Sequence, residues 1–148
     1  MRARFLRREE RSYVQSIFGK SIPLDDILVT DAMGSSISPV EPFETPTGRS
    51  KYCLSMGKDG FASCLTVTMK PLFVQCLTYV WQRRFTPSKY HPSCGQRGQR
   101  VGYKVGQSWH EYTPEQQAQM VSDWAAEGML ANDPRAPYIA NHIRIGAA

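Results

Sequence analysis

The chain has 148 residues, of which 41% are hydrophobic, 21% charged and 11% aromatic. This composition is typical of a globular protein and argues against wholesale disorder. The length suits one domain over residues 1–148, which can bury about 70% of its extended surface without a disulfide or a metal. No apolar run reaches the roughly 18 residues that a membrane span needs, and none follows the basic segment 1–8. We therefore expect neither a membrane anchor nor a cleaved secretory signal.

Net charge and cysteine content place few constraints on the class of protein. The net charge of +5 permits an acidic partner without identifying one. Four cysteines are present and no two of them form a CxxC pair: Cys53, Cys64, Cys76 and Cys94. In a chain without an export signal, such cysteines are expected to be reduced thiols.

The first predicted element is an amphipathic helix over residues 7–18. Apolar side chains recur there at helical spacing, acidic residues occupy the first turn, and Gly19 follows as a stop signal. Residues 22–30 then predict a turn into a short strand, with the apolar run 27–29 at its centre. An opening helix followed by a strand is expected.

The next segment is predicted to be a loop followed by a β-hairpin. Residues 31–50 are rich in Ser, Pro and Gly, and three prolines are incompatible with a regular central strand. Residues 51–56 and 61–68 both resemble strands, and the Gly-Lys-Asp-Gly sequence at 57–60 between them has strong turn chemistry. We expect these two segments to pair through that turn.

A buried helix is predicted over residues 71–84. Pro71 suits a first helical position, where its missing N–H costs nothing, and apolar residues follow at spacings of three and four. A second loop is expected over about 85–100, within a loop-like stretch that reaches residue 104. Residues 101–109 predict a second small hairpin that turns at Gly106.

A second clear helix is predicted over residues 113–127. Thr113 caps it, the following proline takes the first position, and Gln116 completes a capping box. Gly128 ends it, and a last short helix is expected over about 137–146. These elements together predict an α+β fold in which helices pack with a small antiparallel sheet.

Two short patterns within the second loop have possible binding chemistry. His91 and Cys94 have the spacing of two metal ligands, but no second pair is present to complete a tetrahedral site. Six basic residues occur between 83 and 104, where there is no acidic residue: Arg83, Arg84, Lys89, Arg97, Arg100 and Lys104. Aromatic residues among them fit nucleic-acid binding, but no recognised nucleic-acid motif is present, and such loops are usually solvated.

The helix at 73–82 carries the most informative spacing. Positions 75 and 79 are four residues apart and share one face of a helix. A zinc peptidase helix has His at both such positions and Glu directly after the first, so that two imidazoles hold the metal and the Glu acts on its bound water. In this chain those three positions are occupied by Gln75, Cys76 and Tyr79.

The order of the elements resembles a family of small zincin-like, vgr-related proteins encoded near VgrG and Rhs genes of bacterial type VI secretion. That family has an opening helix with a phrase like SIFG, a helix ending in a motif of the form HExTHVWQ, and a later helix start close to EQQAxIVxD. This chain has SIFG at 16–19, LTYVWQ at 77–82 and EQQAQMVSD at 115–123. The resemblance covers about residues 6–127.

The resemblance implies a zincin-like fold with a degenerate metal site. Glu115 corresponds to the third zinc ligand of the family, whereas both histidines and the catalytic Glu are replaced by Gln75, Cys76 and Tyr79. One carboxylate with an amide and a phenol is a poor zinc site, and an amide is no general base. We therefore expect no bound metal, no cofactor and no peptidase activity.

The function implied by the resemblance is that of a catalytically inactive metallopeptidase-like protein. It would act by protein binding in type VI secretion or interbacterial competition, as an effector, an immunity protein or an adaptor. We expect a partner encoded nearby, such as a VgrG, Rhs, effector or immunity protein, and a location in the bacterial cytoplasm with type VI secretion as a non-classical delivery route. The six basic residues are the expected contact surface. Two alternatives remain: altered enzyme chemistry at Cys76 or Glu115, and a basic nucleic-acid-binding module.

Overall fold

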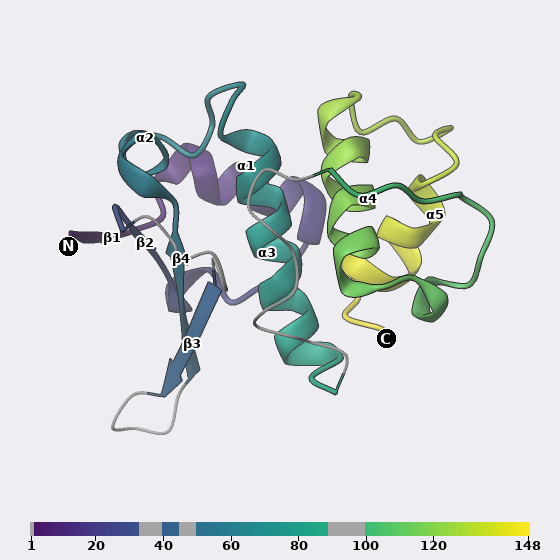
Figure 1. Cartoon of the computed structure of the whole chain (residues 1–148), viewed down its shortest axis with the longest axis horizontal. Helices are drawn as coiled ribbons and strands as arrows, with labels where there is room; N and C mark the ends of the chain where they lie inside the picture. The colour runs from purple at the N-terminus through teal and green to yellow at the C-terminus, as the bar shows by residue number, and fades with distance from the viewer. Residues whose placement is uncertain (1, 33–39, 45–49, 89–99) are drawn as a thin grey trace.

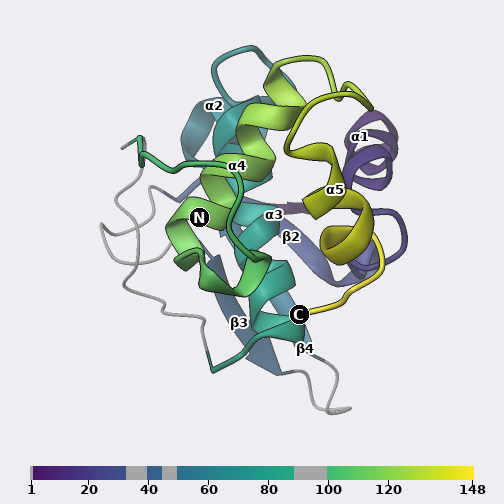
Figure 2. The same cartoon turned by 90° about the vertical axis from the view of Figure 1, so that its right-hand side faces the viewer.

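The computed structural model describes residues 2–32, 40–44, 50–88 and 100–148, and its elements form layers. Helix α3 (Lys70–Phe85) lies between a sheet on one side and helices α4 (Pro114–Ala126) and α5 (Ala136–Tyr138) on the other (Figure 1). Seen after a turn of 90°, α4 lies in front of α3 and the sheet lies behind it (Figure 2). Helices packed with a sheet confirm the predicted α+β class.

The described residues form a four-stranded sheet of mixed direction. Its strands are β1 (Ala3–Phe5), β2 (Ile27–Thr30), β3 (Val40–Glu44) and β4 (Ser50–Ser55), in the order β1-β2-β4-β3. The outer pairs β1–β2 and β3–β4 are antiparallel, whereas the central pair β2–β4 is parallel. The expectation of a purely antiparallel sheet was therefore wrong, although the predicted strand at 27–29 is confirmed.

Strand β3 corrects the prediction of an uninterrupted loop over residues 31–50. It pairs with β4 from Val40 to Glu44 and contains Pro42, which is opposite Tyr52. Proline is tolerated there because β3 is an edge strand, where the missing N–H removes no bond to a further strand. The prolines excluded a central strand, as expected, but they did not exclude an edge strand. Residues 33–39 and 45–49 of the predicted loop lie outside the described part of the chain.

The predicted hairpin of 51–56 with 61–68 was also wrong. Strand β4 forms, but its two edges are taken by β2 and β3, so no edge remains for a second segment. The chain instead enters the short helix α2 (Gly57–Ala62), beginning with Gly57 at a φ of 72°. Gly60 allows its own backbone to lie close to Met56, since a Cβ at this position would be 2.4 Å from the Met56 Cβ.

Helix α3 confirms the helix predicted at 71–84 and forms the centre of the core. Proline occupies its first turn, as expected, and buried side chains occur on most of its faces. The Trp81 indole N–H donates to the Ile143 carbonyl at 3.0 Å, which ties α3 to the C-terminal segment. Among the described residues, no helix combines the length and apolar character needed to span a bilayer.

The C-terminal segment packs against helix α1 (Arg8–Phe18). Helix α1 confirms the predicted opening helix, and it ends at Gly19 with a φ of 58°. The Arg144 guanidinium donates to the Ser16 carbonyl at 3.0 Å, so the C-terminal turn lies against α1. That turn follows α5 and the short π-helical segment η3 (Ile139–Ile143), which together form the predicted last helix.

Helix α4 confirms the predicted capping box but not the hairpin before it. The Gln116 N–H donates to the Thr113 hydroxyl at 3.1 Å, and the Thr113 N–H donates to the Gln116 side chain at 3.0 Å. Residues 101–109 contain no strand, because backbone groups of this segment bond to α4: Val101 N–H contacts Gln119, and the Gly102 carbonyl accepts from Gln116. Two single-turn 3-10 helices complete the described elements, η1 (Leu24–Asp26) and η2 (Trp109–Glu111).

Candidate functional site

Helices α3 and α4 pack in opposite directions, and this pairing positions the motif residues. At one end, the Ser122 hydroxyl donates to the Pro71 carbonyl at 3.3 Å. At the other end, the buried Gln82 amide donates to the Pro114 carbonyl at 2.9 Å and to the Gln117 side chain at 3.0 Å. The first turn of α4 therefore lies against the last turns of α3.

The residues at the motif positions differ in burial. Cys76 is fully buried, Tyr79 is buried at 8% exposure, and Gln75 and Glu115 are half-buried. Gln75 and Tyr79 follow Pro71 at four and eight residues, next to the face of α3 that contacts α4. Glu115 precedes Ser122 by seven residues and shares its face of α4. The helix that bears Glu115 thus lies beside the helix that bears Gln75 and Tyr79.

These side chains do not fit a zinc ion. Zinc sites in proteins use imidazole, thiolate and carboxylate ligands, whereas positions 75 and 79 supply an amide and a phenol. Among the described residues, no group of three or more His, Cys, Asp or Glu side chains could hold a metal ion. The candidate pair His91 and Cys94 lies outside the described residues.

The burial of Cys76 bears on its use as a nucleophile. Its side chain has no exposed surface, and cysteines that react are partly accessible thiolates in electropositive surroundings. Cys53, Cys64 and Cys76 all carry free thiols, which agrees with the expected reduced state of these three residues. An enzyme that acts through Cys76 would need α3 to move away from its neighbours.

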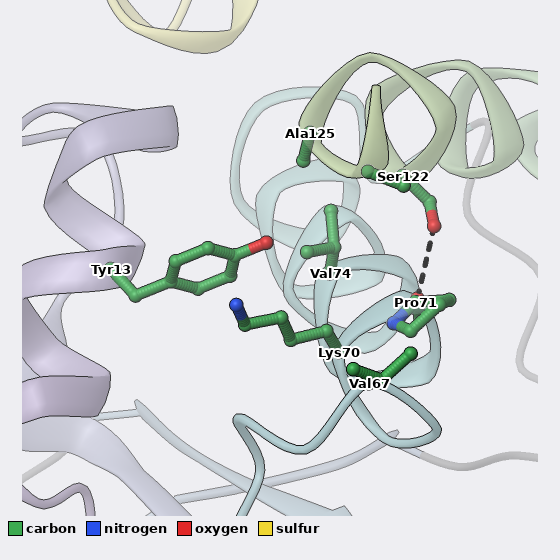
Figure 3. Close-up of a pocket in the computed structure, with 8 residues that line it drawn as sticks. Tyr13, Val67, Lys70, Pro71, Val74, Ser122 and Ala125 are labelled. Carbon is green, nitrogen blue, oxygen red and sulfur yellow. Dashed lines mark hydrogen bonds between the residues drawn. The ribbon is translucent and has the colours of Figure 1, made fainter. Parts of the chain in front are cut away.

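A pocket of about 220 Å³ lies between α1, α3 and α4, near the start of α3 (Figure 3). Val74 and Ala125 form apolar walls, while Tyr13 and Lys70 supply polar groups. Residues 75, 76, 79 and 115 do not line it. The structure thus contains a recess beside α3 that the spacing of residues 75, 76 and 79 did not indicate.

The six basic residues fall into three groups. Arg83 and Arg84 are exposed in the last turn of α3, where the negative end of the helix dipole favours positive charge. Arg100 is tied to α4, and Lys104 is exposed. Lys89 and Arg97 lie outside the described residues.

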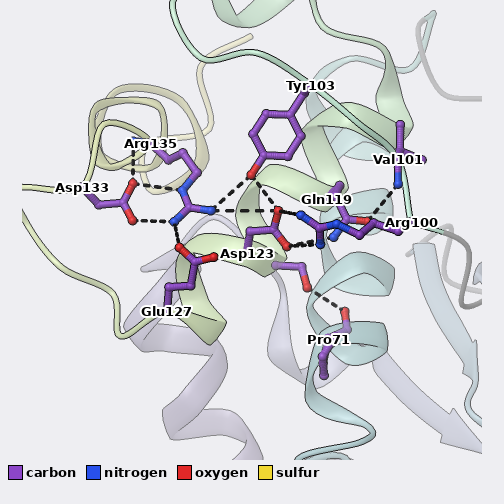
Figure 4. Close-up of polar contacts among 10 residues, drawn as sticks. Pro71, Arg100, Val101, Tyr103, Gln119, Asp123, Glu127, Asp133 and Arg135 are labelled. Carbon is purple, nitrogen blue, oxygen red and sulfur yellow. Dashed lines mark hydrogen bonds and ion pairs between the residues drawn. The ribbon is translucent and has the colours of Figure 1, made fainter.

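Asp123 of α4 is the acidic partner that the local sequence did not reveal. Arg100 donates to both of its carboxylate oxygens at 2.9 Å, and the Tyr103 hydroxyl donates at 2.7 Å (Figure 4). Burial favours the neutral acid, but the hydrogen bonds from Arg100, Tyr103 and Gln119 outweigh it and lower the pKa of Asp123. Burial and the bond to Asp123 raise the pKa of Tyr103 to about 12. The expectation that Arg100 lacks a compensating acid was therefore wrong.

Arg135 extends the same network toward the C-terminal segment. Its guanidinium contacts Asp133 at 2.6 Å, Tyr103 at 3.2 Å and Glu127 at a short distance (Figure 4). Its hydrogen bond to Asp133 is the main reason that the pKa of Arg135 is raised. Because charges of both signs are paired here, the network anchors the segment 100–104 rather than offering an open charged site. Two pairs in the network are close in sequence: Gln119 and Asp123 are four residues apart, and Asp133 and Arg135 are two apart.

Comparisons of this chain with protein-family models, with curated proteins and with solved structures found no match.

Proposed function

We propose that this chain is a catalytically inactive, zincin-like protein that acts by binding another protein in type VI secretion or interbacterial competition. The observation that carries the proposal is the pairing of α3 with α4. Helix α3 bears Gln75, Cys76 and Tyr79, which the resemblance aligns with a zinc peptidase motif. Glu115, which the resemblance aligns with the third zinc ligand, is on the adjacent helix α4. A helix pair of this kind without its metal ligands suits a binding role.

Burial and charge support a binding role over altered enzyme chemistry. Cys76 has no exposed surface, which disfavours it as a nucleophile. Arg83 and Arg84 are exposed at the end of α3 and make no ion pair with a described residue. Exposed charges of one sign mainly raise the rate and the specificity of association. We place the contact surface at this end of α3, and its partner is an acidic protein encoded nearby.

The experiment is a pull-down from the bacterium that encodes this chain, with the double variant Arg83→Glu and Arg84→Glu as the test. The matched control is Arg8→Glu with Lys58→Glu, which makes the same charge change at two exposed residues elsewhere. The native chain and the control should recover the same partner, and the test variant should recover several-fold less. Raising the salt should weaken capture by the native chain, because salt screens exposed charges.

The outcomes separate the three functions. Equal recovery by both double variants would show that this end of α3 is not the interface. Recovery of nucleic acid that a nuclease removes would favour the nucleic-acid-binding module. Hydrolysis of a captured protein that is lost in Cys76→Ser or Glu115→Gln would favour an enzyme.

A further inference from the structure

The pocket between α1, α3 and α4 carries chemistry that the proposed function does not use. It lies at the start of α3, whereas Arg83 and Arg84 lie at the end. Tyr13 reaches it from α1, Lys70 and Val74 from α3, and Ala125 from α4 (Figure 3). Three elements that are distant in sequence therefore form one recess.

The polar groups of the pocket are donors. The Lys70 ammonium lies 5.2 Å from the centre of the Tyr13 ring, and the Tyr13 hydroxyl faces the same space (Figure 3). Burial raises the pKa of Tyr13, so its hydroxyl keeps its proton and can donate. The Ser122 hydroxyl is already used, since it donates to the Pro71 carbonyl.

The Lys70 ammonium lies over the Tyr13 ring, but no anionic side chain balances its charge within this recess. No acidic side chain is among the residues that line it. Of the ion pairs among the described residues, none includes Lys70. A partly buried ammonium beside a phenol donor suits an anion with two acceptor oxygens. A carboxylate has this form.

The rest of the recess is apolar and small. Val74 and Ala125 line it, and Val67, which is 90% exposed, stands at its rim. An exposed valine beside a pocket adds apolar surface that a ligand can cover. A cavity of about 150 Å³ is enough for benzene, so 220 Å³ holds a phenyl or branched alkyl group together with a carboxylate.

We propose that this pocket binds a small monocarboxylate with one compact apolar group. The carboxylate pairs with the Lys70 ammonium and accepts from the Tyr13 hydroxyl. The apolar group lies against Val74 and Ala125 and is covered by Val67. The site is independent of the proposed protein-binding function.

The test is an NMR titration of the whole chain with phenylacetate, which has about ten heavy atoms and should saturate in the millimolar range. The methyl signals of Val67, Val74 and Ala125 should shift together and saturate. Phenylacetamide has the same shape without the charge, and it should bind at least tenfold more weakly. Lys70→Met should weaken phenylacetate binding at least tenfold, whereas Lys58→Met, a change at an exposed lysine outside the pocket, should leave it unchanged.

A second variant tests the same site in case Lys70→Met fails to fold. Ala125→Leu fills the recess without changing its charge, so it should abolish saturable shifts with phenylacetate. Equal affinity for phenylacetate and phenylacetamide would overturn the proposal, as would shifts that map to Arg83 and Arg84. Binding of an acetylated peptide that ends in Phe, without binding of phenylacetate, would also overturn it.

Discussion

The Arg4 guanidinium and the Glu10 carboxylate form a two-point ion pair, with N–O distances of 2.7 and 2.9 Å. Glu10 is only 2% exposed, and it also accepts from the N–H groups of Arg7 at 2.8 Å and Cys64 at 3.0 Å. One carboxylate thus joins β1, the start of α1 and the turn after α2. Burial opposes ionisation of Glu10, but these bonds outweigh it and lower its pKa to about 2.

Glu10 should therefore make the stability of the fold depend on pH. A carboxyl whose pKa is depressed in the folded state stabilises it above its unfolded pKa, and the effect is lost as pH falls toward the folded pKa. For a drop from 4.5 to about 2, the contribution near neutral pH is on the order of 3 kcal/mol. We expect the native chain to have a larger free energy of unfolding than Glu10→Gln. Urea unfolding should show this difference to be about 2 kcal/mol smaller at pH 3 than at pH 6.

The exposed neighbour Glu9 provides the control for this prediction. The free energy of unfolding of Glu9→Gln should change with pH as that of the native chain does, because Glu9 is solvated in the folded and the unfolded state. A Glu10→Gln variant whose stability ran parallel to that of the native chain from pH 6 to pH 3 would contradict the role given to Glu10.

Arg135 and Arg100 offer a second comparison, because both contact Asp123 but differ in burial. The Arg135 side chain is 10% exposed and that of Arg100 is 70% exposed. Removing one partner of a buried ion pair costs about 3–5 kcal/mol, whereas an exposed pair contributes about 0–1 kcal/mol. Arg135→Met should lower the free energy of unfolding severalfold more than Arg100→Met, as measured by urea unfolding at neutral pH. Similar losses in the two variants would show that the network does not stabilise the fold through Arg135.

Local signals in the sequence were sufficient for helices α1, α3 and α4, although not for the short helix α2. Thr113 and Gln116 are three residues apart, so their reciprocal capping depends on no distant partner. Gly19 ended α1 for an equally local reason, since it takes a positive φ that other residues avoid. The apolar spacing also predicted α3 correctly, because a helix buried on most faces still follows the helical period.

Features that depend on distant segments could not be predicted in this way. The Asp-Gly turn at 59–60 is sound chemistry for a hairpin, but β4 already has neighbours on both edges. Pro42 is allowed only because β3 is at the edge of the sheet, which is a property of the strand order. Asp123 is 23 residues from Arg100, so the sequence around Arg100 gave no sign of its partner.

Thiol accessibility provides a third prediction. Cys64 and Cys76 are both fully buried, and burial raises the pKa of the Cys64 thiol, with the Glu10 carboxylate adding to the effect. Cys53 is partly exposed. In the folded chain, iodoacetamide should modify Cys53 faster than Cys64 or Cys76 by at least tenfold, and all three should react in denaturant. Peptide mapping by mass spectrometry measures each site, and rapid labelling of Cys76 in the folded chain would instead favour an enzyme with altered chemistry.

The native chain should contain no stoichiometric zinc. Helix α3 has Gln75 and Tyr79 at the positions where the resemblance implies two imidazoles, and neither group is an effective zinc ligand. Elemental analysis after dialysis gives the metal content per chain. One zinc per chain would contradict the prediction and would direct attention to His91 and Cys94.

The last prediction asks whether Glu115 is within reach of the motif positions. In the family that the sequence resembles, two histidines and a downstream carboxylate hold the metal. If the resemblance is correct, Gln75→His with Tyr79→His rebuilds this ligand set. Cys76 is left unchanged, because a Glu at this fully buried position would add an unpaired charge to the core. With Glu115 on the helix beside α3, this double variant should bind zinc and gain thermal stability, by an amount that rises with the logarithm of its zinc affinity.

The matched control adds Glu115→Gln to the same double variant. Loss of the carboxylate should lower zinc affinity at least tenfold, and zinc should then stabilise the chain much less in a thermal melt. The native chain, which lacks both imidazoles, should show no such stabilisation. If the double variant binds zinc equally well with and without the carboxylate of Glu115, then Glu115 is not the third ligand and the helix pair does not carry a degenerate zincin-like metal site.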